Sequence, residues 1–169
     1  MLKQLHLHLG FFLFLMLAAS TLIEGCAQQG GTKPQVSVVD YQTLVERLQS
    51  EGAAITVVNN QGVWAVLLKN AATGRVIQIN GTTVFVYEYP TQQDMNAATS
   101  HISADGSGVN GGIYDWGSSE VHFYRAKRVV VFYNGKDEAI RQLLRNAMGP
   151  QFAGYPYDPG QPTPTPGTY

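Results

Sequence analysis

The sequence is poor in charged residues and nearly lacks cysteine. Asp, Glu, Lys and Arg make up 14% of its 169 residues, against about 25% in an average soluble domain. The formal net charge of −1 excludes a strongly basic nucleic-acid-binding protein and an acidic, disordered chain. The single cysteine, Cys26, excludes an internal disulfide framework and a cysteine-based zinc cluster. The length allows one domain with flanking segments.

The N-terminal residues 1–25 have the pattern of an export signal. Lys3 precedes a largely apolar stretch of 15 residues, 9–23. Because a membrane-spanning helix needs about 20 apolar residues, this stretch is short for an anchor and fits a secretory signal. Two alternatives stay open, namely cleavage by signal peptidase I near Ala18-Ala19-Ser20 and retention as an uncleaved anchor.

The end of this signal, Leu22-Ile23-Glu24-Gly25-Cys26, resembles the lipobox of bacterial lipoproteins. Ile23 is the aliphatic residue three positions before the cysteine and Gly25 the small residue directly before it, whereas Glu24 departs from the usual small residue between them. The resemblance implies that Cys26 is diacylated on sulfur and becomes the mature N-terminus. Two or three acyl chains give a stable membrane anchor, because one chain holds a protein only marginally.

Beyond the signal, several short strings carry a second resemblance. They are Arg75-Val76-Ile77-Gln78-Ile79-Asn80-Gly81, Val86-Tyr87-Glu88-Tyr89, Ser103-Ala104-Asp105-Gly106, His122-Phe123-Tyr124-Arg125 and Gly149-Pro150-Gln151-Phe152-Ala153-Gly154. On these strings, which span most of residues 40–154, the chain is similar to a group of small bacterial lipoproteins of uncharacterised function. The resemblance implies an exported, lipid-anchored domain and transfers no activity, ligand or catalytic residue.

The mature chain divides into three zones. Residues 26–39 carry Gln, Gly and Thr without an apolar period and predict a flexible tether. Residues 40–149 are long enough for one core and predict a single domain. Residues 150–169 hold six of the eight prolines and predict a disordered Pro/Thr-rich tail.

Periodicity predicts three helices and six strands within that domain. A helix is expected after Asp40, which caps an apolar face of Tyr41, Leu44, Val45 and Leu48, and Gly52 stops it. A second follows Thr91, with Met95, Ala98 and Ile102 inward, and a third begins near Lys136, with Ile140, Leu143, Leu144 and Ala147 inward. The predicted strands are residues 54–58, 63–68, 75–79, 82–89, 121–124 and 129–133.

This order predicts an α+β fold, an antiparallel sheet with about three helices packed on one face. Asn80-Gly81 is a strong signal for a hairpin between two of the strands. A shift of 45 residues aligns Val84-Phe85-Val86-Tyr87 with Val129-Val130-Val131-Phe132. Since a helix is expected after each of these strands, the pattern suggests a ββα pseudo-repeat.

Candidate chemistry concentrates in residues 103–119, a segment with five glycines. A long loop of this kind in a small domain is often functional, and Asp105, Asp115 and Trp116 are its candidate ligand-binding residues. Oxygen atoms around Asp105 suit calcium, but the further carboxylates of an EF-type loop are missing, which favours an ordinary turn. We expect no metal and no cofactor.

His122 is one of two histidines that remain after processing. An extracytoplasmic hydrolase could use it with Asp115 or Glu120, and with Ser118 or Ser119 as nucleophile. The sequence has no Gly-x-Ser-x-Gly elbow, however, and a buried strand histidine with a hydrogen-bond partner fits the pattern as well. No catalytic residue is assigned, and His122, Tyr124 and Arg125 complete the candidate ligand-binding set.

Two surface features suggest partners. Aromatic residues line the predicted sheet and either fill its core or, on an uncovered face, bind a protein or glycan: Tyr87, Tyr89, Tyr114, Trp116, Phe123, Tyr124 and Tyr133. Arg125, Lys127 and Arg128 at the second hairpin's turn are either solvated or in contact with anionic headgroups.

These patterns together predict a lipoprotein on the outer face of the cell membrane that binds or assembles other envelope components, a protein or a glycan but no nucleic acid. Ala27 replaces the aspartate that retains some lipoproteins at the inner membrane, which permits outer-membrane sorting where a second membrane exists. A hydrolase and a purely structural envelope component are the alternatives.

Overall fold

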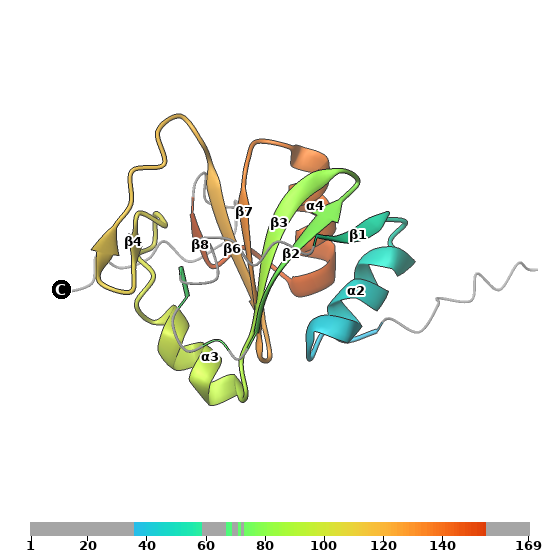
Figure 1. Cartoon of the computed structure of the whole chain (residues 1–169), viewed down its shortest axis with the longest axis horizontal. Helices are drawn as coiled ribbons and strands as arrows, with labels where there is room; N and C mark the ends of the chain where they lie inside the picture. Colours follow the sequence, from blue (N-terminus) through green and yellow to red (C-terminus); the bar gives the residue numbers. More distant parts are fainter. Residues whose placement is uncertain (1–35, 59–66, 69–70, 72, 155–169) are drawn as a thin grey trace, which may run out of the picture. The chain divides into compact units, whose positions relative to one another are not determined.

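The computed structural model describes residues 36–58, 67–68, 71 and 73–154, and these residues form an α+β fold (Figure 1). They contain a six-stranded antiparallel sheet in the order β1-β2-β3-β7-β6-β8, a small β4–β5 sheet and three helices. The elements are α2 (Tyr41–Ser50), β1 (Ile55–Val58), β2 (Thr73–Ile79), β3 (Thr82–Glu88), α3 (Gln92–Thr99), β4 (Gly108–Val109), β5 (Gly112–Ile113), β6 (Val121–Ala126), β7 (Val129–Asn134), α4 (Glu138–Met148) and β8 (Ala153–Gly154). The predicted fold class is confirmed.

Local signals placed the turns and helix starts correctly. Asp40 caps α2 in a reciprocal capping box with Thr43, and Thr91 caps α3. Asn80 and Gly81 join β2 to β3 with φ angles of 53° and 83°, the left-handed conformation that a two-residue hairpin requires. Asp137 accepts hydrogen bonds from the first turn of α4, so that helix begins next to the predicted Lys136.

The sheet separates two hydrophobic clusters, because successive side chains of a strand point to opposite faces. On one face, α2 and α4 pack on β2, β3, β6 and β7 through residues such as Leu48, Ile77, Val86 and Leu144. On the other, α3 packs with aromatic residues of β3, β6 and β7. Figure 1 shows α3 across the sheet from α2 and α4. The expectation that all three helices share one face is therefore corrected.

The suggested ββα repeat holds for the hairpins and fails for the helices. β3 and β7 pair antiparallel with Val86 opposite Val131, the two residues that the 45-residue shift equates. This register relates the two hairpins by a local two-fold axis perpendicular to the sheet. Such an axis does not exchange the two faces, so equivalent residues of the two hairpins lie on the same face of the sheet. A repeated unit would put both following helices on one face, whereas α3 and α4 lie on opposite faces.

The ordered fold extends beyond the predicted domain boundaries. Val38 is buried in the first cluster, and residues 151–154 are ordered, with β8 paired to β6. β8 thus lies beyond residue 149, within the segment that the sequence analysis assigned to the tail. Of the predicted strand at 63–68, residues 63–66 lie outside the described part, and Leu67 and Leu68 form a buried turn. The signal, most of the tether and residues 155–169 also lie outside it.

Gly154, in the edge strand β8, approaches the backbone of β6 more closely than any residue with a side chain could. Its φ is 116°, and a Cβ atom at this position would lie 1.9 Å from the carbonyl oxygen of Val121. The backbone of β8 consequently rests directly on that of β6, at the pair His122 and Gly154.

Replacing Gly154 by Ala should therefore lower the free energy of unfolding by about 3 kcal/mol, through backbone strain and displacement of β8 together. Gly111→Ala is the matched control, since Gly111 also has a positive φ (78°) but nothing within 4 Å of a Cβ. Gly111→Ala should lower the free energy of unfolding only through backbone strain, by about 1–2 kcal/mol. Denaturant unfolding measures both, and equal losses would contradict the close approach.

Candidate functional site

The glycine-rich segment 103–119 contains a small, exposed hairpin. β4 and β5 are joined by Asn110 and Gly111, with φ angles of 53° and 78°. At its end Ile113 is 91% exposed, and the adjacent Tyr114 is 37% exposed. Among the described residues, these two are neighbouring members of a set of four exposed large apolar side chains, the others being Val39 and Val57.

Hydrogen bonds fix this hairpin to the rest of the fold. Ser103 N donates to Gly108 O at 2.8 Å, and Tyr114 N donates to Ser107 O at 2.8 Å. Val109 is buried in the second cluster, and the Asn110 side chain donates to Leu67 O at 2.6 Å. Ile113 pairs with Gly108 at the end of the hairpin away from the turn, so the exposed apolar side chains lie on a hydrogen-bonded, preformed surface.

Asp105 organises the start of the segment. Its carboxylate accepts hydrogen bonds from the Ser103 hydroxyl at 2.6 Å and from the Ser107 amide and hydroxyl at 3.0 and 2.9 Å. These bonds, that from Ser103 above all, lower the pKa of Asp105 below its ordinary 3.8. The carboxylate oxygens therefore accept hydrogen bonds within a turn. This is the structural alternative to calcium binding that the sequence also allowed.

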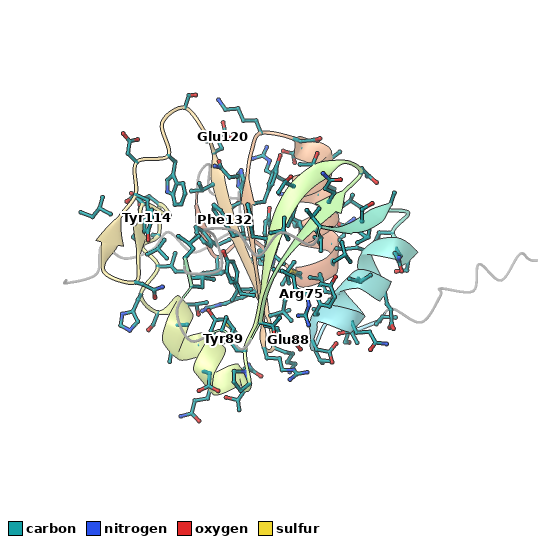
Figure 2. All side chains as sticks on the ribbon, in the orientation of Figure 1. Arg75, Glu88, Tyr89, Tyr114, Glu120 and Phe132 are labelled. Atoms are coloured by element: carbon teal, nitrogen blue, oxygen red, sulfur yellow. The ribbon has the colours of Figure 1, made fainter. Side chains whose placement is uncertain are left out.

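Trp116 lies between aromatic neighbours. Its ring stacks on Tyr114, with centroids 5.3 Å apart, and packs at an angle on Phe132 at 5.4 Å. Its indole N–H donates to Gly106 O at 3.0 Å. Figure 2 shows Tyr114 beside the β4 region and Phe132 on the sheet. The Trp116 ring is thus engaged with two aromatic neighbours, one of them stacked on its face.

The other aromatic residues of the expected set belong to the core. Tyr87, Tyr89, Phe123, Tyr124 and Tyr133 are buried. Burial raises the pKa of Tyr89 to about 12 and that of Tyr87 still further. Of the seven, Tyr114 and Trp116 alone reach the surface.

His122 is fully buried on the opposite face of β6 from Phe123. Its Nδ1 lies 2.7 Å from Gln151 Oε1 and its Nε2 lies 3.0 Å from Gly135 O. Burial lowers the pKa of the imidazole below 6.5. Within the described part no hydrogen bond joins it to Asp115 or Glu120. Both nitrogens are engaged, so the geometry assembles no acid–base pair for a hydrolase.

The remaining predicted site residues are dispersed. Tyr124 lies in the first cluster, beneath α2 and α4. Arg125 is exposed, with its guanidinium 4.6 Å from the Phe152 ring centroid and donating to Thr99 Oγ1 at 3.0 Å. Asp115 is exposed and accepts from Gly117 N at 2.8 Å. The six candidates therefore form no single site; only Asp105, Asp115 and Trp116 share the segment that carries the hairpin.

The basic hairpin turn is partly neutralised by neighbours. Arg128 lies 3.1 Å from Glu88 and 3.4 Å from Asp40, and Arg75 lies 3.0 Å from Glu88. Arg75 also covers the Tyr41 ring at 4.2 Å. Figure 2 places Arg75 and Glu88 together at this end of the sheet. The cluster ties α2 to β2, β3 and the β6–β7 turn, and Arg125 and Lys127 remain as exposed cations near that turn.

Sequence reasoning missed Ile113 as a candidate. A single exposed isoleucine among glycines has no periodicity, but the Asn110-Gly111 dipeptide is a hairpin signal that would have located the turn. The environment of His122 had no local signal, because Gly135 and Gln151 are distant in the sequence.

No protein-family model matches the chain, and neither a curated protein nor a solved structure matches it. Within the described ranges, no helix is long and apolar enough to cross a bilayer. In the same ranges, no group of three or more His, Cys, Asp or Glu side chains is placed to hold a metal ion.

The turn that Asp105 organises should stabilise the β4–β5 hairpin. Asp105→Ala removes the acceptor for Ser103 and Ser107, so stability should fall by about 1–2 kcal/mol and the Ser107 and Gly108 amides should exchange faster. Asp115→Ala removes a single exposed bond and should change stability by less than about 0.5 kcal/mol. The pKa of Asp105 is lowered in the folded state. The stabilisation that its charged carboxylate gives to the folded state is therefore present above pH 3.8 and is lost as the pH falls below that value. Equal exchange rates in both variants would contradict this role.

Proposed function

We propose that this protein is a lipid-anchored lipoprotein of the bacterial envelope whose domain lies outside the cytoplasmic membrane and binds a partner protein through the β4–β5 hairpin. The anchor rests on the lipobox-like sequence that ends at Cys26. The binding role rests on one observation, the 91% exposure of Ile113 on a hairpin whose base is fixed by hydrogen bonds.

A preformed apolar surface suits recognition of a protein. Binding costs less when the contacting residues are already ordered, and buried apolar anchors supply much of the energy at protein interfaces. Gly111, in the turn of the hairpin, is exposed and leaves its backbone accessible to a partner. A protein partner is favoured over a glycan because the Trp116 ring already packs on Tyr114 and Phe132.

The absence of a hydrolytic arrangement around His122 also favours binding over catalysis. The imidazole is enclosed by Gln151, Gly135 and Tyr133, so a substrate would have to displace part of the fold to reach it. The hydrolase alternative has no observation in its favour, and we do not propose it.

The anchor is tested by Cys26→Ser in a bacterial host that processes lipoproteins. The wild-type chain should incorporate labelled palmitate and remain with membranes after a high-salt wash, because acyl chains and not charges hold it. The variant should lose the label and appear in the soluble extracytoplasmic fraction. Mass spectrometry of the mature N-terminus identifies the modified residue. An unlabelled wild type, or a variant equally bound to membranes, would overturn the anchor.

The binding surface is tested by placing a photo-crosslinking amino acid at position 113 in intact cells. A discrete protein adduct should form there, and Ile113→Asp should abolish co-purification of the same partner. Val57 is the matched control, because it is an exposed (56%) aliphatic residue on β1, outside the hairpin. A crosslinker at 57 and Val57→Asp should leave the adduct and the co-purification unchanged. Identical behaviour at both positions would show that exposure alone explains the capture.

A further inference from the structure

The buried His122 lies beneath the last strand of the sheet. β6 contacts β7 on one side through six residue pairs and β8 on the other through two, His122 with Gly154 and Phe123 with Ala153. Gln151, two residues before β8, is buried and reaches the imidazole with its side chain. The segment from Gln151 to Gly154 therefore separates His122 from water on this side.

The hydrogen bonds of His122 serve either protonation state. In the neutral ring, Nε2–H donates to Gly135 O, and Nδ1 accepts from the Gln151 amide nitrogen after a 180° turn of that amide. In the imidazolium both nitrogens donate, to Gly135 O and Gln151 Oε1. Both imidazole nitrogens are therefore hydrogen-bonded in either protonation state. The cost of protonation is the presence of a charge in a buried site.

The charged groups that face His122 do not offset that cost. Burial is the largest influence on its pKa and acts against protonation, and Arg141 on α4 adds repulsion. Glu120 acts in the opposite direction but lies 3.9 Å from the Lys136 ammonium. Asp137 caps α4 through backbone amides, and the neutral Tyr133 ring stacks on the imidazole from β7 with centroids 5.7 Å apart.

Of the two strands that pair with β6, β8 has fewer residue pairs, so its detachment opens a path for water to the imidazolium with the smaller loss of pairing. β7 is buried between two strands and two hydrophobic clusters, so moving it would disrupt the whole sheet. β8 contributes two residue pairs at the edge of the sheet. Local openings of this kind occur where few contacts hold an element.

We propose that protonation of His122 releases β8 from β6, so that residues 151–154 open in mild acid while the rest of the sheet stays folded. The closed state, in which the pKa of His122 is lowered, binds the proton more weakly than the open state, where the pKa returns to about 6.5. The stability of the closed strand is therefore fully present above pH 6.5. It falls as the pH drops below that value towards the lowered pKa.

Hydrogen exchange of the full mature chain between pH 5 and 8 tests this proposal. The reporters are the Phe152 amide, which donates to Phe123 O, and the Gly154 amide, which donates to Ala104 O. Protection factors, corrected for the intrinsic pH dependence of exchange, should be constant above pH 6.5 and fall by up to tenfold per pH unit below it. Amides of β7 should keep their protection throughout.

Two variants and one control separate this release from a general effect of acid. His122→Gln cannot titrate, so the protection of Phe152 and Gly154 should lose its pH dependence even where closure is weaker overall. Gln151→Glu places a carboxylate against Nδ1, so the imidazolium becomes favourable in the closed state and acid should no longer reduce protection. His101→Gln, which changes an exposed histidine, should behave as wild type.

Three results would overturn the proposal. The first is an unchanged pH dependence of Phe152 and Gly154 exchange in His122→Gln. The second is a simultaneous loss of protection in β7, which would show global unfolding. The third is constant protection in the wild type down to pH 5.

Discussion

The pairing of β3 with β7 is the contact on which the described fold depends. These strands connect β1 and β2 to β6 and β8 through four residue pairs, from Phe85 with Phe132 to Glu88 with Val129. Both strands contribute side chains to both hydrophobic clusters. Residues 129–133 of β7 are all buried. Their nearly continuous apolar sequence is the one expected for a strand that is covered on both faces.

Burial on both faces also explains why neighbouring residues of β6 lie in different environments. Successive side chains point to opposite sides of a strand, so Phe123 packs in the aromatic cluster whereas His122 and Tyr124 face the side of α2 and α4. A contiguous string such as His122-Phe123-Tyr124-Arg125 therefore cannot form one binding site. The same alternation separates His122 from Trp116, which packs on Phe132 in the aromatic cluster.

The sequence predicted those parts of the fold that depend on short-range chemistry. The Asn80-Gly81 turn, the Asp40 and Thr91 caps and the inward Met95 and Ala98 of α3 are decided within a few residues, and the structure has them. Ile102, predicted on the same helical face, lies beyond the end of α3 and bridges Val109 instead. The face on which α3 packs, the pairing of β8 and the partners of His122 depend on contacts between distant residues. Gly154 shows the limit clearly, since its necessity follows from the Val121 carbonyl oxygen, which no local pattern predicts.

The hairpin and the buried histidine meet at β8, although they lie on different faces of the sheet. Gly154 N donates to Ala104 O at 2.9 Å, and a Cβ on Gly106 would lie 3.2 Å from the Gly154 Cα atom. The strand that encloses His122 thus also supports the base of the segment that carries Ile113. If protonation detaches β8, the hairpin loses this support, and a partner that requires the ordered hairpin binds less tightly in acid. By thermodynamic linkage, the bound partner then opposes protonation of His122 to the same extent.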